Sequence, residues 1–132
     1  MRVVVDSSLI VGICLAGGRL GPLDGHELRA PALLPAEVTS ALREQSFRHE
    51  ITPEHARGAL SILADLPIAH EPPGSLALDT LQIASDLGWA KTHDAEYVAL
   101  AQSLDCPLIT LDARLQRGAA RFARILGPTE LL

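Results

Sequence analysis

The chain has 132 residues, a mass of 14.0 kDa and a formal net charge of −5. This length is sufficient for one domain with a hydrophobic core, and a hydrophobic fraction of 48% excludes a disordered chain. Aromatic residues make up only 3%, which argues against recognition of bases by stacked aromatic side chains. The negative charge argues against a generic polyanion binder. We therefore expect a single domain over residues 1–132.

The two cysteines, Cys14 and Cys106, have no spacing typical of a metal or redox motif, and we expect both to be reduced. No apolar stretch reaches the length needed to span a membrane, and Asp6 interrupts the apolar N-terminus. We accordingly expect a cytoplasmic protein with no membrane partner.

The first predicted element is a strand at residues 2–6 (RVVVD), a continuous apolar run that ends in Asp6. Runs of this kind are typical of strands covered on both faces, as in a parallel sheet between two layers of helices. The glycine-rich segment 17–25 that follows is expected to be a flexible loop. Weaker strands are predicted at residues 28–30, 67–70 and 123–126.

Helices with recognisable ends occupy most of the middle of the chain. The first has Pro35 in its first turn, the second opens with Thr52 and Pro53, and the third closes on Gly88; each residue is typical of its helix position. A last buried strand is predicted at residues 107–112 (PLITLD). The four predicted helices span residues 34–49, 52–66, 76–88 and 92–104.

Four carboxylates occupy positions that such a fold brings together. The order of the elements predicts an α/β fold, namely a three-layer α/β/α domain with a mostly parallel central sheet. Asp6 and Asp112 end the two best strands, at the edge where ligands bind in sheets of this type. Glu37 lies in the first turn of one helix on its apolar side, and Asp94 begins another helix whose inward face carries Tyr97. We expect each carboxylate at the border of the core.

Each of these acids also has a purely structural interpretation. Asp6 and Asp112 could cap helices, while Glu37 and Asp94 suit the positive N-terminal ends of theirs. Together, however, clustered carboxylates repel one another, by about 4 kcal/mol for a pair at 4 Å and an effective dielectric of 20. A divalent cation removes this repulsion, and a ligand set made only of oxygens favours Mg²⁺ or Mn²⁺ over zinc. The other acids, Glu71 among them, are expected to be solvated.

Three segments in this order resemble the PIN domain, and within it the VapC-type toxins of prokaryotic toxin–antitoxin pairs: VVVDSS, LPAEVTSAL and HDAEYVALAQSLDCPLITLD. The resemblance implies a metal-dependent endoribonuclease in which Asp6, Glu37, Asp94 and Asp112 are catalytic and hold one or two Mg²⁺ or Mn²⁺ ions. Such ions activate a water that hydrolyses RNA to 5′-phosphate and 3′-hydroxyl ends, with Asp94 or Glu37 orienting the water. It further implies a homodimer and a VapB-like antitoxin partner.

Further polar residues have weaker assignments. Ser7 and Thr110 match accessory hydroxyl positions of the family, and His93 stands where an aromatic residue often precedes the third acid. Four arginines at steps of three, four and three fall on one face if their segment is helical, although Gly118 weakens that helix. A solvated face, or an attachment site for an acidic antitoxin tail, is the alternative to RNA binding. The residues predicted to bind RNA phosphates are Arg114, Arg117 and Arg121, with Arg124 extending the stripe.

Two other families with an Asp after the first strand fit poorly. A haloacid-dehalogenase-type phosphatase needs a second Asp two positions on, where Ser8 stands, and a receiver domain needs paired acids and a later lysine, whereas Lys91 is in the wrong context. Two alternatives stay open: a PIN nuclease of RNA processing that is not a toxin, and a catalytically degenerate PIN-like binding module.

Overall fold

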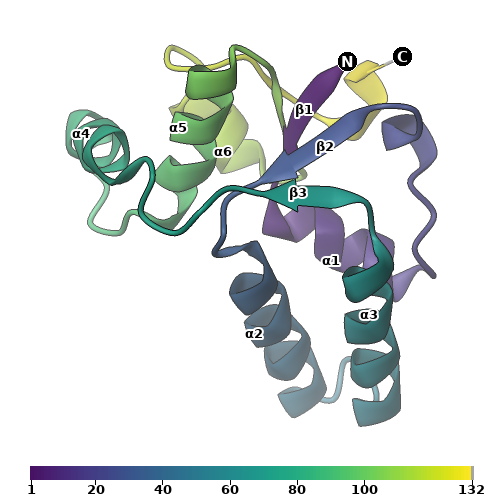
Figure 1. The fold of residues 1–132 in the computed structure, drawn as a ribbon. Coiled ribbons are helices and arrows are strands. Elements are labelled where there is room, and N and C mark those ends of the chain that lie inside the picture. The colour runs from purple at the N-terminus through teal and green to yellow at the C-terminus, as the bar shows by residue number, and fades with distance from the viewer. Residues whose placement is uncertain (132) are drawn as a thin grey trace.

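The computed structural model describes residues 1–131 and contains a five-stranded sheet of order β3-β2-β1-β4-β5 (Figure 1). All four strand pairings are parallel, which confirms the parallel sheet predicted from the apolar strand sequences. Each predicted strand is present, although several are shorter than expected. The strands are β1 (Arg2–Val5), β2 (Glu27–Ala30), β3 (Ile68–His70), β4 (Leu108–Ile109) and β5 (Ile125–Leu126).

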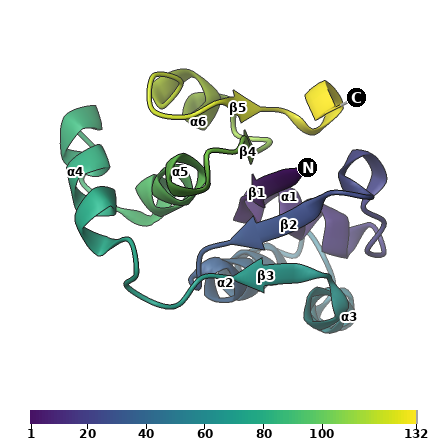
Figure 2. The same ribbon diagram turned by 45° about the horizontal axis from the view of Figure 1, so that its top comes forward.

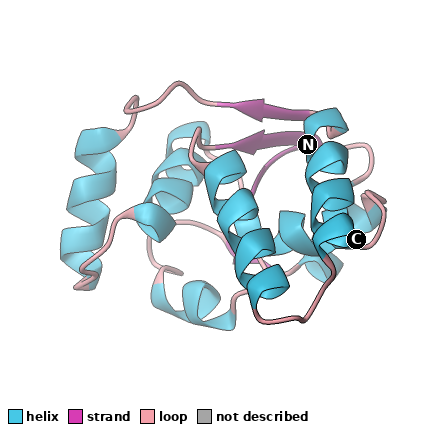
Figure 3. Ribbon diagram, turned by 90° about the horizontal axis from the view of Figure 1, so that it is seen from below, coloured by secondary structure: helices cyan, strands magenta, loops and turns pink. Residues whose placement is uncertain are grey.

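Helices cover both faces of the sheet, which confirms the three-layer α/β/α architecture. On one face, α1, α2 and α3 pack against one another, and Figure 3 shows helices from below in front of much of the sheet. On the other face, α5 packs on β1 and β4, α6 on β5, and α4 lies outermost against α5 (Figure 2). The helices are α1 (Ser7–Leu15), α2 (Leu34–Phe47), α3 (Pro53–Asp65), α4 (Ala77–Leu87), α5 (His93–Leu104) and α6 (Ala113–Gly118), with 3-10 turns at Gly21–Leu23 and Pro128–Leu131.

The order of the strands reverses at β1. The chain runs outward from β1 to β2 and β3, then returns through α4 and α5 to place β4 on the other side of β1. In open parallel sheets the crevice for ligands lies at such a reversal, outside the carboxyl ends of the two strands. Asp6 directly follows β1, and Thr110 directly follows β4. The topology therefore brings the two predicted strand-end acids, Asp6 and Asp112, to one place.

Local sequence explains where the helices begin and end. Thr52 caps α3, because its hydroxyl oxygen accepts the N–H of His55 at 3.0 Å, and Pro53 is the first helical residue, as predicted. Gly88 ends α4 in the left-handed conformation at φ 72°, which only glycine adopts without cost. Helix α1 was not among the predicted helices. Its N-cap is Asp6, so the possible capping role of that residue is real.

The glycine-rich segment 17–25 is more structured than the expected flexible loop. It contains the 3-10 turn Gly21–Leu23, and the Leu23 side chain is buried in the core. A single leucine among glycines forms no periodic apolar pattern, so the burial of Leu23 could not be predicted from the sequence. Cys14 and Cys106 are both free, as expected.

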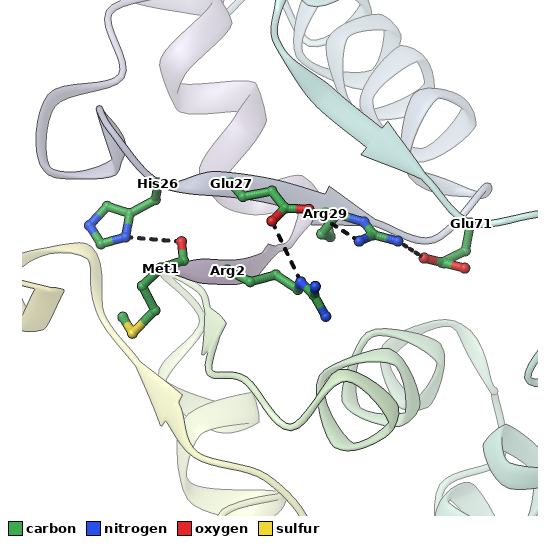
Figure 4. Close-up of polar contacts among 6 residues, drawn as sticks. All are labelled: Met1, Arg2, His26, Glu27, Arg29 and Glu71. Atoms are coloured by element: carbon green, nitrogen blue, oxygen red, sulfur yellow. Dashed lines mark hydrogen bonds and ion pairs between the residues drawn. The ribbon is translucent and has the colours of Figure 1, made fainter.

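A charged cluster lies on β1 and β2 beside the edge strand β3 (Figure 4). Arg29 pairs closely with Glu71 and lies 3.3 Å from Glu27, which in turn lies 3.6 Å from Arg2. Glu71 is therefore a half-buried ion-pair partner, and the expectation that it would be solvated was wrong. No helix among residues 1–131 is long and apolar enough to cross a membrane.

Candidate active site

Asp6 is the most buried acid of the site, with 5% of its surface exposed, and the chain supplies its partners. Oδ1 accepts the N–H of Leu9 at 3.1 Å and the hydroxyl of Ser8 at 2.9 Å, and Oδ2 accepts the hydroxyl of Thr110. Burial raises the pKa of the Asp6 carboxyl, and these donors offset part of that increase. Asp94 raises the pKa of Asp6 further by charge repulsion, so the two acids interact.

Thr110 connects Asp6 to the fourth acid. Its buried hydroxyl donates to Asp6 and accepts the N–H of Asp112 at 2.9 Å, so one side chain holds both strand ends. Asp112 caps α6, because its Oδ1 accepts the N–H groups of Arg114 at 2.9 Å and Leu115 at 3.4 Å. The structural role considered for Asp112 is therefore present, and the cap leaves Oδ2 free of the helix. That oxygen lies 3.6 Å from the Arg114 guanidinium.

Glu37 and Asp94 lie in the first turns of α2 and α5. Glu37 is half-buried, but Asp94 is exposed, so the expectation that every one of these acids would lie at the border of the core was wrong for Asp94. The hydroxyl of the buried Tyr97 donates to Oε1 of Glu37 at 2.6 Å, a link between positions 60 residues apart. Burial raises the pKa of the Asp94 carboxyl, the charge of Asp112 raises it further, and Arg114 and His93 lower it in part. Asp94 and Asp112 therefore interact electrostatically across the carboxyl ends of the sheet.

Three of the four predicted acids line one open pocket of about 460 Å³. The fourth, Asp6, lies behind it and is joined to the pocket through Thr110 and through its repulsion with Asp94. Lys91 and Arg114 add positive charge to the pocket wall. The lining residues are Glu37, Trp89, Lys91, His93, Asp94, Asp112, Arg114 and Leu115.

The chemistry of this donor set suits a hard divalent cation, since the pocket acids offer only carboxylate oxygens. The side chains do not already form a cage: among residues 1–131, no group of three or more His, Cys, Asp or Glu side chains is arranged to hold a metal ion. Binding of Mg²⁺ or Mn²⁺ would therefore require the carboxylates to move toward one another. Their mutual repulsion is a physical reason for them to lie apart without a cation.

The predicted arginine stripe does not form on one helix, because α6 ends at Gly118. Arg114 and Arg117 belong to α6, and Arg114 reaches the pocket. Arg121 lies beyond the helix, where its Nη2 donates to the carbonyl of Asp86 at 2.9 Å and its guanidinium stacks on Phe122 at 4.9 Å from the ring centroid. Of the arginines predicted to bind RNA, Arg114 is thus the one that lines the acidic pocket.

Relatives of known family share the sequence along most of the chain. The chain is 37% identical over 118 residues to ribonuclease VapC1 of Mycobacterium tuberculosis, covering 85% of this chain and 86% of the relative. It is 33% identical over 114 residues to VapC ribonuclease Mb0985 of Mycobacterium bovis, covering 86% and 87%. The chain belongs to the VapC ribonuclease family. No family model matches the sequence.

Solved structures show that the fold is that of VapC proteins. PAE2754 from Pyrobaculum aerophilum superposes with a TM-score of 0.74 at 22% identity, covering 99% of this chain and 87% of that one. The VapBC-1 structure from nontypeable Haemophilus influenzae gives 0.62 at 18% identity, with coverage of 98% and 99%. The VapBC2 structure from Rickettsia felis, bound to a DNA fragment from its promoter, gives 0.65 at 15% identity, with coverage of 96% and 97%. The predicted PIN-like α/β/α fold is confirmed.

The site of this VapC protein includes residues that the sequence did not single out. Ser8 and Leu9 complete the shell around Asp6, and Tyr97 holds Glu37. Tyr97 was placed on the inward face of its helix, correctly, but an apolar pattern cannot show that its hydroxyl reaches a carboxylate 60 residues away. Ser7 lies close to the Tyr97 hydroxyl and lowers the raised pKa of the phenol in part.

Proposed function

We propose that this VapC protein is a metal-dependent endoribonuclease and acts as the toxin of a VapBC-type pair. The observation that carries the proposal is the pocket lined by Glu37, Asp94 and Asp112, to which the buried Asp6 is joined through Thr110. The names of its relatives as ribonucleases support the activity, and the two VapBC structural neighbours support an antitoxin partner. Cleavage of RNA by such a toxin would inhibit translation or growth.

The proposed chemistry is hydrolysis of a phosphodiester. Carboxylates of Asp6, Glu37, Asp94 and Asp112 would hold Mg²⁺ or Mn²⁺, which when bound lowers the pKa of a ligated water and stabilises negative charge on the phosphate. Asp94 or Glu37 orients the attacking water and accepts its proton. The water oxygen bonds to phosphorus while the P–O3′ bond breaks, and the 3′-oxygen takes up a proton from solvent. The products then carry a 5′-phosphate and a 3′-hydroxyl.

Positive groups beside the acids would hold the RNA backbone. Lys91 and Arg114 line the pocket, and Arg117 follows on the same helix as Arg114. Phosphate contacts of this kind position a substrate without reading its sequence. The net charge of −5 argues against binding of a polyanion such as RNA. A bound divalent cation would neutralise the pocket acids and so remove their repulsion of the phosphates.

We also propose a homodimer. Two leucines of the outermost helix α4 are strongly exposed, Leu78 at 84% and Leu81 at 62%. Exposed apolar side chains on one helix are typical of protein–protein contact surfaces. Sedimentation analysis of the purified chain tests this point, and a monomer at all concentrations would contradict it.

The test of the activity is cleavage of a mixed tRNA and rRNA pool with Mg²⁺ or Mn²⁺. Wild type should give discrete fragments with 5′-phosphate ends, and both Asp94→Asn and EDTA should abolish them. Asp79→Asn is the matched control, because Asp79 also lies in the first turn of a helix but is exposed on α4 and outside the pocket. If wild type and Asp94→Asn cut equally, or if neither cuts, the four-acid site loses its support.

The second candidate function is a PIN-like binding module without catalysis. It is favoured by the finding that no three of the candidate ligands within residues 1–131 are ready to hold an ion. The same assay decides between the two, because a binding module would bind RNA or its partner but leave the RNA intact with every metal tested.

A further inference from the structure

Tyr97 joins the two helices that carry Glu37 and Asp94, two of the pocket acids. It lies on α5 one turn after Asp94, and its hydroxyl donates to Oε1 of Glu37 on α2 at 2.6 Å. The side chain is 1% exposed, so the ring is fixed by the core while its polar tip reaches the site. The position of Glu37 relative to Asp94 thus depends on a rigid side chain anchored in Asp94's own helix.

The Tyr97 hydroxyl acts as a donor to Glu37. A tyrosine phenol is ordinarily protonated at neutral pH and has one proton to donate. A carboxylate can only accept, so the hydroxyl is the donor of this bond. Its proton is directed at the carboxylate, in a hydrogen bond of the short charge-assisted type.

Because of this bond, the two carboxylate oxygens of Glu37 have different partners. Oε1 accepts the Tyr97 hydroxyl, Glu37 lines the pocket, and no further side-chain hydrogen bond to its carboxylate is found among residues 1–131, so Oε2 can serve a ligand. A free glutamate side chain samples many rotamers, and a bound ion must select one of them at an entropic cost. A donor that fixes the carboxylate in advance reduces this cost, as groups behind metal ligands commonly do.

We propose that Tyr97 is a positioning residue that orients Glu37 toward the divalent cation. The proposal rests on the proposed function, because it assigns a task to Tyr97 at the same metal site. Tyr97 does not touch substrate or metal; it acts only through the Glu37 carboxylate. Removing the hydroxyl while keeping the ring should therefore weaken metal binding without unfolding the protein.

The experiment measures Mn²⁺ affinity without RNA, from the electron paramagnetic resonance signal of free Mn²⁺. The four proteins are wild type, Tyr97→Phe, Glu37→Gln and the double variant. We expect Tyr97→Phe to weaken Mn²⁺ binding about 10-fold or more in the wild-type background. In the Glu37→Gln background the same change should have little further effect, because the hydroxyl has lost the group through which it acts. Thr80→Val is the control, since it removes a buried hydroxyl that has no hydrogen-bond partner among residues 1–131.

Three outcomes overturn the proposal. Tyr97→Phe could bind Mn²⁺ as wild type does, it could weaken binding equally in both backgrounds, or Thr80→Val could weaken binding as much. The proposed function fails in a different way, because then Glu37→Gln and Asp94→Asn would themselves leave Mn²⁺ binding unchanged. In that case there is no site for Tyr97 to organise, and the positioning role falls with it.

A second measurement needs no change at Tyr97. The chain contains one tyrosine, so labelling with tyrosine that carries carbon-13 at the ζ position gives a single resonance from the carbon bonded to the hydroxyl. Mg²⁺ should shift this resonance saturably in wild type, because ligation of Glu37 changes the hydrogen bond. The shift should vanish in Glu37→Gln. A resonance that ignores Mg²⁺ in wild type, while Mn²⁺ binds through Glu37, would overturn the proposal.

Discussion

The hydroxyl of Thr110, directly after β4, donates a hydrogen bond to Oδ2 of Asp6, directly after β1. Both residues are buried, and they are 104 positions apart in the chain. The same hydroxyl accepts the N–H of Asp112 at 2.9 Å. One side chain therefore holds the most buried acid of the site and the turn that carries another acid.

Thr110→Val should destabilise the protein, because it preserves shape but removes both hydrogen bonds. Loss of a partner to a buried carboxylate costs about 1–3 kcal/mol, which urea unfolding at neutral pH would measure. Thr39→Val is the matched control, because its hydroxyl is exposed and donates to the carbonyl of Pro35 in the same helix. Equal stabilities of Thr110→Val and wild type would contradict this prediction.

The stability of the metal-free protein should fall as the pH rises from acid to neutral. The pKa values of Asp6 and Asp94 are raised above their usual 3.8 in the folded protein, mainly by burial. Between the unfolded and folded pKa values the native state binds more protons than the unfolded state, so stability declines with increasing pH. The stabilisation that comes from these two protonated acids is fully present below their pKa in the unfolded state. It is lost as the pH rises through their higher pKa in the folded state.

Asp6→Asn should flatten this pH profile, because asparagine carries no charge while its amide oxygen still caps a helix. Urea unfolding in EDTA from about pH 4 to about pH 8 would measure the slope. A profile that stays as steep in Asp6→Asn as in wild type would show that the buried carboxyl is not its origin. A site acid that destabilises its own fold is retained for another purpose, here the proposed metal site.

Divalent cations should offset part of the destabilisation that the site carboxylates cause in the metal-free protein at neutral pH. A ligand that binds only the folded state stabilises it by about 2.7 kcal/mol at 100 times its dissociation constant. We expect Mg²⁺ to raise the thermal midpoint of wild type in a concentration-dependent manner, and Asp94→Asn to show much less of the effect. Na⁺ at matched ionic strength separates site binding from screening. A midpoint that follows ionic strength alone would falsify the metal site.

The two roles of Asp112 can be separated by a pair of variants. Asparagine accepts N–H bonds at a helix start as aspartate does, so Asp112→Asn should keep the stability of wild type within about 0.5 kcal/mol while lowering RNA cleavage. Asp112→Ala removes the cap of α6 as well and should cost about 1 kcal/mol in addition. Equal losses of stability in the two variants would mean that the charge, and not the cap, holds the turn.

Much of the fold could be predicted because the sequence pattern is local. Continuous apolar runs gave β1 and β4, and Thr52, Pro53 and Gly88 marked helix ends that the structure contains. Helix α1 was not predicted because its residues Ser7–Leu15 are mostly apolar and show no helical periodicity of apolar and polar residues. Five of its nine residues are buried. A helix that is covered on most sides has no polar face, so its sequence lacks the amphipathic pattern by which helices are predicted.

The positions of the four candidate acids could also be predicted, but their hydrogen-bond partners could not. Strand ends and helix starts pointed to Asp6, Glu37, Asp94 and Asp112 as candidates, whereas the hydrogen bonds from Thr110 and Tyr97 span 104 and 60 residues. Such pairings depend on the strand order and on the packing of α5 against the sheet, which no single segment encodes. For the same reason the segment after Gly118 was open to a helical interpretation that the structure does not adopt.

Arg114 and Arg121 should differ in their contribution to RNA binding. Arg114 lines the acidic pocket, whereas Arg121 bonds to the carbonyl of Asp86 and stacks on Phe122. Each phosphate contact adds about one to the slope of log affinity against log salt. In an Asp94→Asn background, which we expect not to cut the labelled RNA, Arg114→Ala should weaken binding and reduce that slope by about one. Arg57→Ala, an exposed arginine of α3 outside the pocket, is the control. We expect Arg121→Ala to behave like this control. If Arg121→Ala reduces the slope and Arg114→Ala does not, the RNA backbone contacts Arg121, after the end of α6, and does not cross the acidic pocket.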